Sequence, residues 1–173
     1  MCMTSSLAVA AVSAMPIELP QVDCVFCERI AGERDDWALI EEAADTISFV
    51  GPAQWEVGQS LVIPRRHVPT ILDLTAAEAT AMMAAVRRLS KAIVDAYDPD
   101  GLTLYQNNGV ASRQEVPHVH VHVVPRRYNS GWGEGPPHIA PLERAERDRR
   151  LDRTPTGEAH RAAAALIRAR LAE

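Results

Sequence analysis

The sequence predicts an α+β domain, in which one long and one short helix accompany short and mostly antiparallel strands. Two observations predict this fold class. Apolar residues recur at helical spacing between residues 76 and 96, and five other short stretches have the composition or the alternation of strands. The 173 residues, of which 47% are hydrophobic, are enough for one domain with a single core.

The first expected elements are a short helix and three short strands. The helix is expected from Cys24 to about Gly32, because glycine commonly ends a helix. The strands are bounded by turn residues and by a loop that contains proline and glycine. They are expected over Trp37–Glu41, Thr46–Val50 and Ser60–Pro64.

The long helix is expected to begin at a capping box. The hydroxyl of Thr75 can accept the amide of Glu78, whose carboxylate reaches back to the helix start. Four apolar residues at helical spacing, Met82, Val86, Leu89 and Ile93, predict one amphipathic face up to about Ala96. The turn sequence Asp98–Gly101 stops the helix, and a fourth strand is expected over Leu102–Asn107.

Both ends of the chain are expected to lie outside the main domain, residues 21–137. Residues 1–20 are small and apolar but have no basic residue before them, so we interpret them as a flexible leader and not an export signal. Residues 138–173 are expected to form a charged linker and a C-terminal helix over Glu158–Leu171. Its apolar stripe is expected to include Ala162 and Leu166 and to dock on the domain or on a partner.

Charge and hydropathy exclude several classes of protein. The 18 Lys and Arg against 23 Asp and Glu give a formal net charge of −5, which argues against nucleic acid as a partner. Every basic residue except Lys91 is an arginine, which binds phosphate oxygens in bidentate fashion, so a small phosphorylated ligand remains possible. No run reaches the roughly 18 apolar residues of a membrane span. We expect a cytoplasmic protein with no membrane partner.

Three of the six histidines lie at alternate positions of a fifth expected strand, Val116–Val124. With a side-chain period of two, His118, His120 and His122 share one face, and the valines between them face the core. The imidazoles could hold a catalytic zinc, one of them could attack phosphorus, or the face could be a simple polar surface. Asn and Gln amides in residues 107–114 donate to oxyanions without titrating, which favours phosphate.

Two of the three cysteines form the motif Cys24–Cys27. Three cysteines cannot make a disulfide framework, so this spacing indicates metal ligands or a redox pair before it indicates a structural bridge.

The segment His118–Val124 resembles the signature of the histidine triad (HIT) family, in which histidines alternate with hydrophobic residues. Three further blocks of the family match in order and spacing. They are Cys24–Cys27, Leu61–Pro64 with His67, and Asn107–Gln114. The resemblance covers about residues 24–125.

The resemblance implies a fold and a reaction. It implies a five-stranded antiparallel sheet with helices, in a homodimer whose sheets join edge to edge. It also implies a nucleotide hydrolase or nucleotidyl transferase that acts on a nucleoside phosphoramidate or a dinucleoside polyphosphate, with a purine nucleotide favoured. His120 would attack the α-phosphorus and form a nucleotidyl-histidine, which water or another acceptor then releases. No organic cofactor is implied.

The resemblance also implies the site residues. His118 and His122 would complete the catalytic triad, and His122 would hold phosphate oxygens together with Asn107 and Gln114. The base pocket would be lined by four apolar residues, Val25, Phe26, Phe49 and Leu61. A structural zinc ion would be held by Cys24, Cys27, His67 and His118.

Three positions depart from the pattern of the family. Gly51 stands where an acid often binds the ribose hydroxyls, and Gln59 stands where a histidine is common. Glu115 replaces the Ser or Thr that helps the leaving group, and a carboxylate that points inward would repel phosphate. Glu56 and Asp45 are candidates to replace the acid.

Two alternative functions remain open. One is a non-catalytic protein that keeps the fold and binds a nucleotide or a partner, and the other is a zinc hydrolase with the three histidines as metal ligands. Trp55 and Trp132 are candidates for the edge of the pocket, with surface or dimer packing as the alternative.

Overall fold

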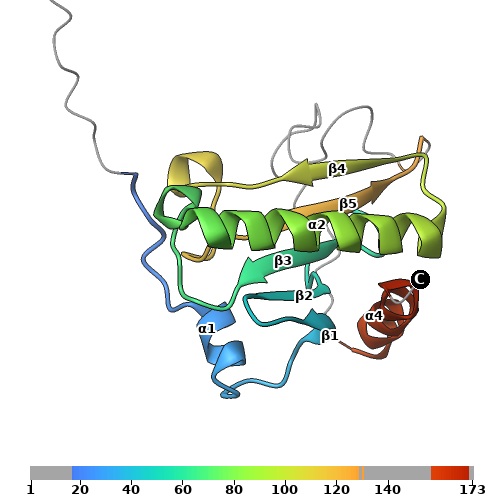
Figure 1. Ribbon diagram of the computed structural model, residues 1–173, viewed down its shortest axis with the longest axis horizontal. Coiled ribbons are helices and arrows are strands. Elements are labelled where there is room, and N and C mark those ends of the chain that lie inside the picture. Colours follow the sequence, from blue (N-terminus) through green and yellow to red (C-terminus); the bar gives the residue numbers. More distant parts are fainter. Residues whose placement is uncertain (1–16, 129, 131–156, 172–173) are drawn as a thin grey trace, which may run out of the picture.

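The computed structural model describes residues 17–128, 130 and 157–171, and its centre is an antiparallel five-stranded sheet in the order β1-β2-β3-β5-β4 (Figure 1). The α+β class and the five-stranded sheet are therefore confirmed. The strands are Ala38–Glu42 (β1), Thr46–Val50 (β2), Ser60–Pro64 (β3), Gly101–Tyr105 (β4) and Val121–Arg126 (β5). The helices are Val25–Ile30 (α1), Ala76–Tyr97 (α2) and Glu158–Leu171 (α4), with short 3-10 turns at Ile71–Asp73 (η1) and Val110–Ser112 (η2).

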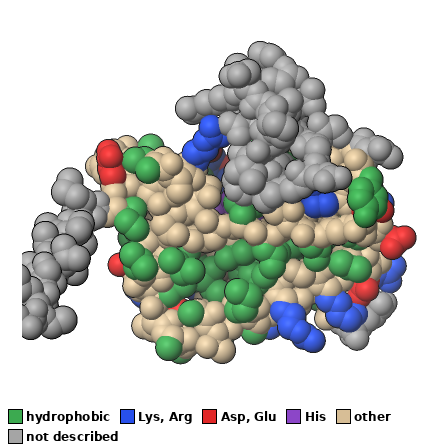
Figure 2. All heavy atoms as spheres, turned by 90° about the horizontal axis from the view of Figure 1, so that it is seen from above, with side chains coloured by type: hydrophobic (Ala, Val, Ile, Leu, Met, Phe, Trp, Pro, Cys, Tyr) green, Lys and Arg blue, Asp and Glu red, His purple; other side chains and the backbone are tan. Residues whose placement is uncertain are grey.

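The edge strand β4 shares an apolar surface with one side of α2. On α2, Arg88 reaches Glu41 of β1, so the side that carries Met83 and Val94 faces the other way, toward β4. Met83, Val94 and Leu104 of β4 are exposed, although each is a large apolar residue. Figure 2 shows the molecule of Figure 1 from above, and on this surface hydrophobic side chains gather in a band.

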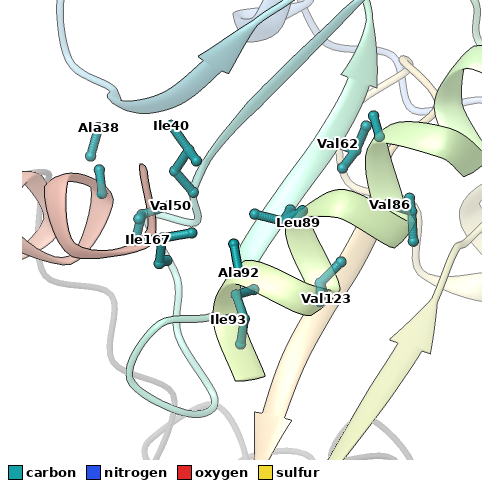
Figure 3. Packing of buried hydrophobic residues seen from close by; sticks show 12 residues of the cluster. Ala38, Ile40, Val50, Val62, Val86, Leu89, Ala92, Ile93, Val123 and Ile167 are labelled. Carbon is teal, nitrogen blue, oxygen red and sulfur yellow. The ribbon is translucent and has the colours of Figure 1, made fainter. Parts of the chain in front are cut away.

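The main core lies between the sheet and the helices α2 and α4. In Figure 3, Leu89, Ala92 and Ile93 of α2 and Ile167 of α4 lie against the side chains of β1, β2, β3 and β5. The opposite face of the sheet carries a second apolar cluster, in which Phe26 of α1 packs on Phe49 and Leu61. Successive residues of a strand point to opposite faces, and the strands β2 and β3, which lie between the two clusters, are buried at every position.

The long helix begins and ends as its sequence predicts. Thr75 and Glu78 form a reciprocal capping box at the first turn. Asp98 takes a left-handed conformation with φ 44°, and its amide donates to the carbonyl of Val94. Among the described residues no helix is both long and apolar enough to cross a membrane.

The C-terminal helix has the predicted bounds, but its predicted apolar stripe is wrong. The buried residues are His160, Ala164 and Ile167, whereas Leu166 is exposed. In an alanine-rich helix the alanines define no face, so the position of the one large β-branched residue decides which side is buried. Arg168 of this helix donates to the carbonyls of Leu39 and Ile40, which covers the edge of β1.

The fifth strand begins later than predicted. The ladder starts at Val121, because Pro117 has no amide to donate and the amide of Val119 donates to Val68 O, at 2.6 Å, outside the sheet. His118 and His120 therefore precede the strand, and only His122 lies within it. The alternation itself holds, since Val119 and Val123 are buried on the side of α2.

The ends of the chain lie largely outside the described residues. The structure does not describe residues 1–16 or the segment 131–156. These residues include Trp132 and most of the expected linker. Within the expected leader, Glu18 accepts the amide of Val110, and Ile17 lies against Gly109. The last residues of that stretch thus contact the loop that precedes the histidines.

Candidate active site

The site is built on one row of residues that runs across the sheet. Leu39, Phe49, Leu61, His122 and Tyr105 are directly opposed from strand to strand, in that order. Directly opposed residues share a face, so the row leads from the apolar side under α1 to the polar side at β5 and β4. A cavity of about 270 Å³ opens on this face.

His120 is the buried histidine at the polar side of the cavity. Its Nδ1 lies 2.7 Å from the carbonyl oxygen of His118, and because a carbonyl can only accept, Nδ1 carries the proton. The lone pair therefore sits on Nε2. Burial lowers the pKa of His120 below its ordinary value, so the ring stays neutral near pH 7 and this lone pair remains available for nucleophilic attack.

The tautomer of His122 is set by Gln59. The Oε1 of Gln59 accepts the backbone amide of Trp55 at 2.8 Å, so the amide nitrogen faces His122 Nδ1 at 3.2 Å. An amide nitrogen can only donate, so Nδ1 of His122 is the acceptor and Nε2 carries the proton. His122 therefore carries an N–H at Nε2, which can donate a hydrogen bond to an oxygen atom in the cavity.

Tyr105 supports His122 from the neighbouring strand. The two rings stack with centroids 4.2 Å apart and an interplanar angle of 10°. The Tyr105 hydroxyl accepts the indole N–H of Trp55 at 3.2 Å, and burial raises the pKa of Tyr105 to about 12. Trp55, a candidate for the pocket edge, thus lines the cavity and also orients this pair.

The predicted substrate-binding residues divide into two groups. Asn107, Val25, Phe26 and Leu61 line the cavity. Phe49 and Gln114 are not among its lining residues. Phe49 is buried behind Phe26, with the ring centroids 5.5 Å apart.

Gln114 uses its amide within the loop that precedes the histidines. Its Oε1 accepts the amide of Gly109 at 2.6 Å, and its Nε2 donates to the carbonyl of Pro69 at 2.7 Å. Gly109 has φ 79°, and a Cβ there would lie 2.8 Å from Glu18 O, so this position requires glycine. Gln114 therefore shapes the loop that precedes the histidines.

Two of the three departures from the family pattern, Gln59 and Glu115, line the cavity, and Gly51 lies behind the lining residue Leu61. A Cβ on Gly51 would meet the Leu61 side chain at 2.7 Å, so an acid at this position would displace a pocket residue. Glu115 lines the cavity, and its charge acts to raise the pKa values of His120 and Tyr105 against the effect of burial on His120.

The two candidates for the missing acid lie elsewhere. Glu56 pairs with Arg126, with Nε and Oε1 3.9 Å apart. Asp45 lies in the turn between β1 and β2, where its carbonyl accepts the amide of Arg65. Neither residue lines the cavity, and among the described residues Glu115 is the one acidic residue in its lining.

Four residues beside the cavity form a compact cluster of metal-ligand atoms. The sulfurs and ring nitrogens of Cys24, Cys27, His67 and His118 all lie within 4.8 Å of one another. Cys24 Sγ is 3.4 Å and Cys27 Sγ is 3.7 Å from His118 Nδ1, and Cys27 Sγ is 3.2 Å from His67 Nδ1.

The donor set of this cluster fits zinc. Two thiolates and two imidazoles form the tetrahedral set of a closed structural zinc site. The Nε2 of His118 donates to Pro64 O at 2.9 Å, which aims its Nδ1 lone pair at the sulfurs and supplies the outer hydrogen bond typical of metal-bound histidine. Burial lowers the pKa of His118 to about 4, so the ring is in the neutral, ligating form. Zinc held here would fix α1 to the segment before β5.

His118 links this cluster to His120. Its ring belongs to the cluster, and its backbone carbonyl holds Nδ1 of His120. Burial is the largest cause that raises the pKa of the Cys27 thiol to about 12, and the hydrogen bond and the charge of Cys24 add to it. A bound cation would therefore have to displace a proton from this sulfur.

Sequence reasoning missed six lining residues, of which three are polar, namely Arg29, Tyr105 and Arg113. The other three are Pro52, Ala53 and Val116. A signal for Arg29 existed, because it lies three and four residues after Phe26 and Val25 and therefore shares their helix face. Tyr105 reaches the cavity because β4 pairs with β5, and the sequence does not specify this pairing. Arg113 has φ 66°, a conformation no pattern in the chain indicates.

Comparisons with known proteins assign this arrangement to a class. The profile described as HIT domain matches residues 55–129. Protein hit of Bacillus subtilis is 35% identical over 113 residues, which are 65% of this chain and 77% of that protein. Adenosine 5′-monophosphoramidase hnt1 of Schizosaccharomyces pombe is 31% identical over 114 residues, 66% of this chain and 81% of that protein. The chain belongs to the HIT domain family.

Two solved structures extend this likeness to the fold. A Hit-like protein involved in cell-cycle regulation from Bartonella henselae superposes with a TM-score of 0.69 at 29% identity, covering 86% of this chain and 96% of that one. A zinc-bound histidine triad family protein from Mycobacterium smegmatis has a TM-score of 0.66 at 26% identity, with 86% and 93% covered. Because this similar structure contains zinc, the cluster of Cys24, Cys27, His67 and His118 is a candidate zinc site.

Proposed function

We propose that this protein is a nucleotide hydrolase or nucleotidyl transferase that cleaves a nucleoside phosphoramidate or a dinucleoside polyphosphate at the α-phosphorus, through a nucleotidyl-His120 intermediate. The observation that carries the proposal is the state of His120, a buried neutral ring whose Nδ1 is committed to a carbonyl and whose Nε2 lone pair is left for attack. The relative named adenosine 5′-monophosphoramidase supports a nucleotide as substrate.

In the first half-reaction, His120 Nε2 forms a bond to the α-phosphorus while the bond from phosphorus to the leaving amine or phosphate breaks. The ring then carries a positive charge, which its Nδ1–H shares with the carbonyl of His118. His122 Nε2–H and the Asn107 amide donate to the phosphoryl oxygens, and the leaving group takes a proton from water. In the second half-reaction water attacks phosphorus, the P–Nε2 bond breaks, and nucleoside monophosphate and neutral His120 are released. The proton that the attacking water loses neutralises the hydroxide left when the leaving group was protonated.

The test is the release of nucleoside 5′-monophosphate from adenosine and guanosine 5′-phosphoramidates and from dinucleoside polyphosphates. We expect release from at least one of them, unaffected by a chelator while the protein stays folded. If nucleoside monophosphates raise the melting temperature but nothing is turned over, the protein is a nucleotide-binding protein. If chelation stops turnover of the folded protein, the zinc-hydrolase alternative holds. The geometry favours the first outcome, because among the described residues His120 and His122 join no metal-ligand cluster.

Replacing Gln59 with methionine is expected to lower kcat/KM by about 10- to 100-fold, less than the loss of a direct oxyanion donor. Methionine keeps the volume but cannot donate to Nδ1, so His122 loses the hydrogen bond that fixes its tautomer. The matched control is Gln54→Met, since Gln54 is a buried amide nearby whose hydrogen bonds within the described part of the chain go to the backbone of Gly51 and Gly58. Nitrogen-15 NMR of His122 should report a mixture of tautomers in Gln59→Met alone. Unchanged spectra and unchanged kcat/KM would contradict the role given to Gln59.

We also propose that two copies of the chain join through the surface formed by β4 and one side of α2. Among the described residues β4 is paired on one side only, with β5, and Met83, Val94 and Leu104 are exposed apolar residues of α2 and β4. The mass in solution is expected to be that of a dimer, and Leu104→Lys is expected to give a monomer. A wild-type protein that is monomeric at micromolar concentration would contradict this.

The division of the chain at residues 20 and 137 remains a prediction.

A further inference from the structure

Arg29 places a buried guanidinium in the wall of the cavity. It lies on α1, three residues after Phe26 and four after Val25, so all three side chains share one face of that helix. Arg29 is only 8% exposed, yet it is one of the residues that line the cavity. A charged side chain is rarely buried to this extent unless it is paired.

The pairing of Arg29 uses only one of its nitrogens. Its Nε donates to Oδ1 of Asp36 at 2.7 Å, and Asp36 is also bound by Arg34, whose Nη2 lies 2.7 Å from Oδ2. The two Nη amino groups of Arg29 donate to no other atom in residues 17–128, 130 and 157–171. Neither Nη nitrogen is completely buried, so both remain accessible. Asp36 thus fixes the fork, and four N–H groups remain for a ligand in the cavity.

The position of Arg29 is at the base side of the proposed nucleotide site. Figure 1 shows α1 beside β1 and β2, whereas β4 lies at the opposite edge of the sheet. His122 and Tyr105 occupy the β5 and β4 side of the row, so a nucleotide with its phosphorus at His120 extends across Leu61 toward α1. The neighbouring lining residues on that side are apolar, namely Val25, Phe26, Pro52, Ala53 and Leu61. Arg29 is therefore the polar group that a base meets there.

We propose that Arg29 selects nucleotides whose base presents two adjacent acceptors, guanine and hypoxanthine, over adenine. The inference rests on the proposed function and names the base that the same site takes. A guanidinium has donors only, and guanine offers O6 and N7 as a matched pair of acceptors. Adenine places its N6 amino donor beside N7, so one arm of the fork would meet a donor instead of an acceptor.

The test compares guanosine, inosine and adenosine 5′-phosphoramidates as substrates of the wild-type protein. Because one bidentate contact of this kind discriminates by about 10- to 100-fold, we expect kcat/KM for guanosine to exceed that for adenosine by this factor. Inosine is expected to follow guanosine, since it keeps O6 and N7 and lacks only the 2-amino group. Calorimetry with GMP, IMP and AMP is expected to give the same order of affinities without any turnover.

Two substitutions separate recognition from stability. Arg29→Met is expected to bring guanosine and adenosine within about threefold of each other, mainly through the loss of the guanosine reaction. Arg29→Lys keeps the charge and the pairing with Asp36 but not the planar fork, and is expected to lose most of the preference. The matched control is Arg34→Met, which removes the exposed partner of Asp36 and leaves the preference as in wild type.

The outcomes distinguish this inference from the function on which it rests. Equal kcat/KM for guanosine and adenosine in wild type, or a preference that survives Arg29→Met, overturns the role of Arg29 and leaves the function standing. If wild type turns over none of the three, the proposed function fails, and the order of GMP, IMP and AMP in calorimetry still decides whether Arg29 reads the base. Equal binding of the three would then overturn the inference as well.

Discussion

Replacing His120 with glutamine is expected to abolish turnover, with kcat reduced by about 10⁴-fold or more, as is typical when a nucleophile that forms a covalent intermediate is removed. Glutamine is similar in size and polarity, but its amide nitrogen has no lone pair available for attack on phosphorus. The fold should survive, because His120 lies in the cavity wall and its ring makes one hydrogen bond, to His118 O. Steady-state release of nucleoside monophosphate measures the loss.

The chain offers a matched control for this substitution. His160 is also a buried histidine, but it lies on α4, away from the cavity. His160→Gln is expected to keep full activity at temperatures where it is folded. Zinc content, melting temperature and affinity for nucleoside monophosphate should be largely unchanged in His120→Gln. Residual activity above about 1% of wild type would mean that His120 is not the nucleophile.

Removal of the metal is expected to lower the melting temperature by about 10 °C while leaving the chemical step of the folded protein nearly unchanged. A ligand present at about 1,000 times its dissociation constant stabilises the native state by about 4.1 kcal/mol, and a chain of this size loses about 2–4 °C per kcal/mol. The four ligands form a closed set, which leaves no position for a catalytic water. Differential scanning fluorimetry with and without a chelator measures the shift.

Cys27→Ser should reproduce the effect of the chelator, because a serine hydroxyl does not replace a thiolate as a zinc ligand. Elemental analysis should find zinc in wild type at one equivalent per chain and little in Cys27→Ser. The control is Cys2→Ser, which changes the third cysteine of the chain and none of the four ligands. Zinc that is retained in Cys27→Ser but lost in His122→Gln would show that the metal sits at the histidine row instead, and would contradict this assignment.

The fold was predictable where local chemistry decides it. The capping box at Thr75, the stop at Asp98 and the strands Thr46–Val50 and Ser60–Pro64 are all where the sequence predicts them. The predictions failed where a distant partner decides. The segment before Val121 bonds to Val68 and not to a strand, and the buried face of α4 is chosen by packing against β1 and α2.

The candidate site divides in the same way. The three histidines could be named from their alternation in the sequence, and the cluster of Cys24, Cys27, His67 and His118 from the resemblance to the family. The link between Gln59 and His122 joins residues 63 positions apart and depends on the register of β3 with β5. Helical spacing puts Arg29 on the same face of α1 as Val25 and Phe26, but it is the packing of α1 on the sheet that brings this face to the cavity.

The central claim, that His120 forms a covalent nucleotidyl intermediate, is tested most directly by the mass of the intact protein. Wild type and His120→Gln are mixed briefly with guanosine or adenosine 5′-phosphoramidate and quenched in base, where a phosphoramidate bond to histidine persists. We expect the mass of one nucleotidyl group on wild type, located on His120 by peptide mapping, and none on His120→Gln. Released nucleoside monophosphate without any adduct, or an adduct on His120→Gln, would contradict the claim.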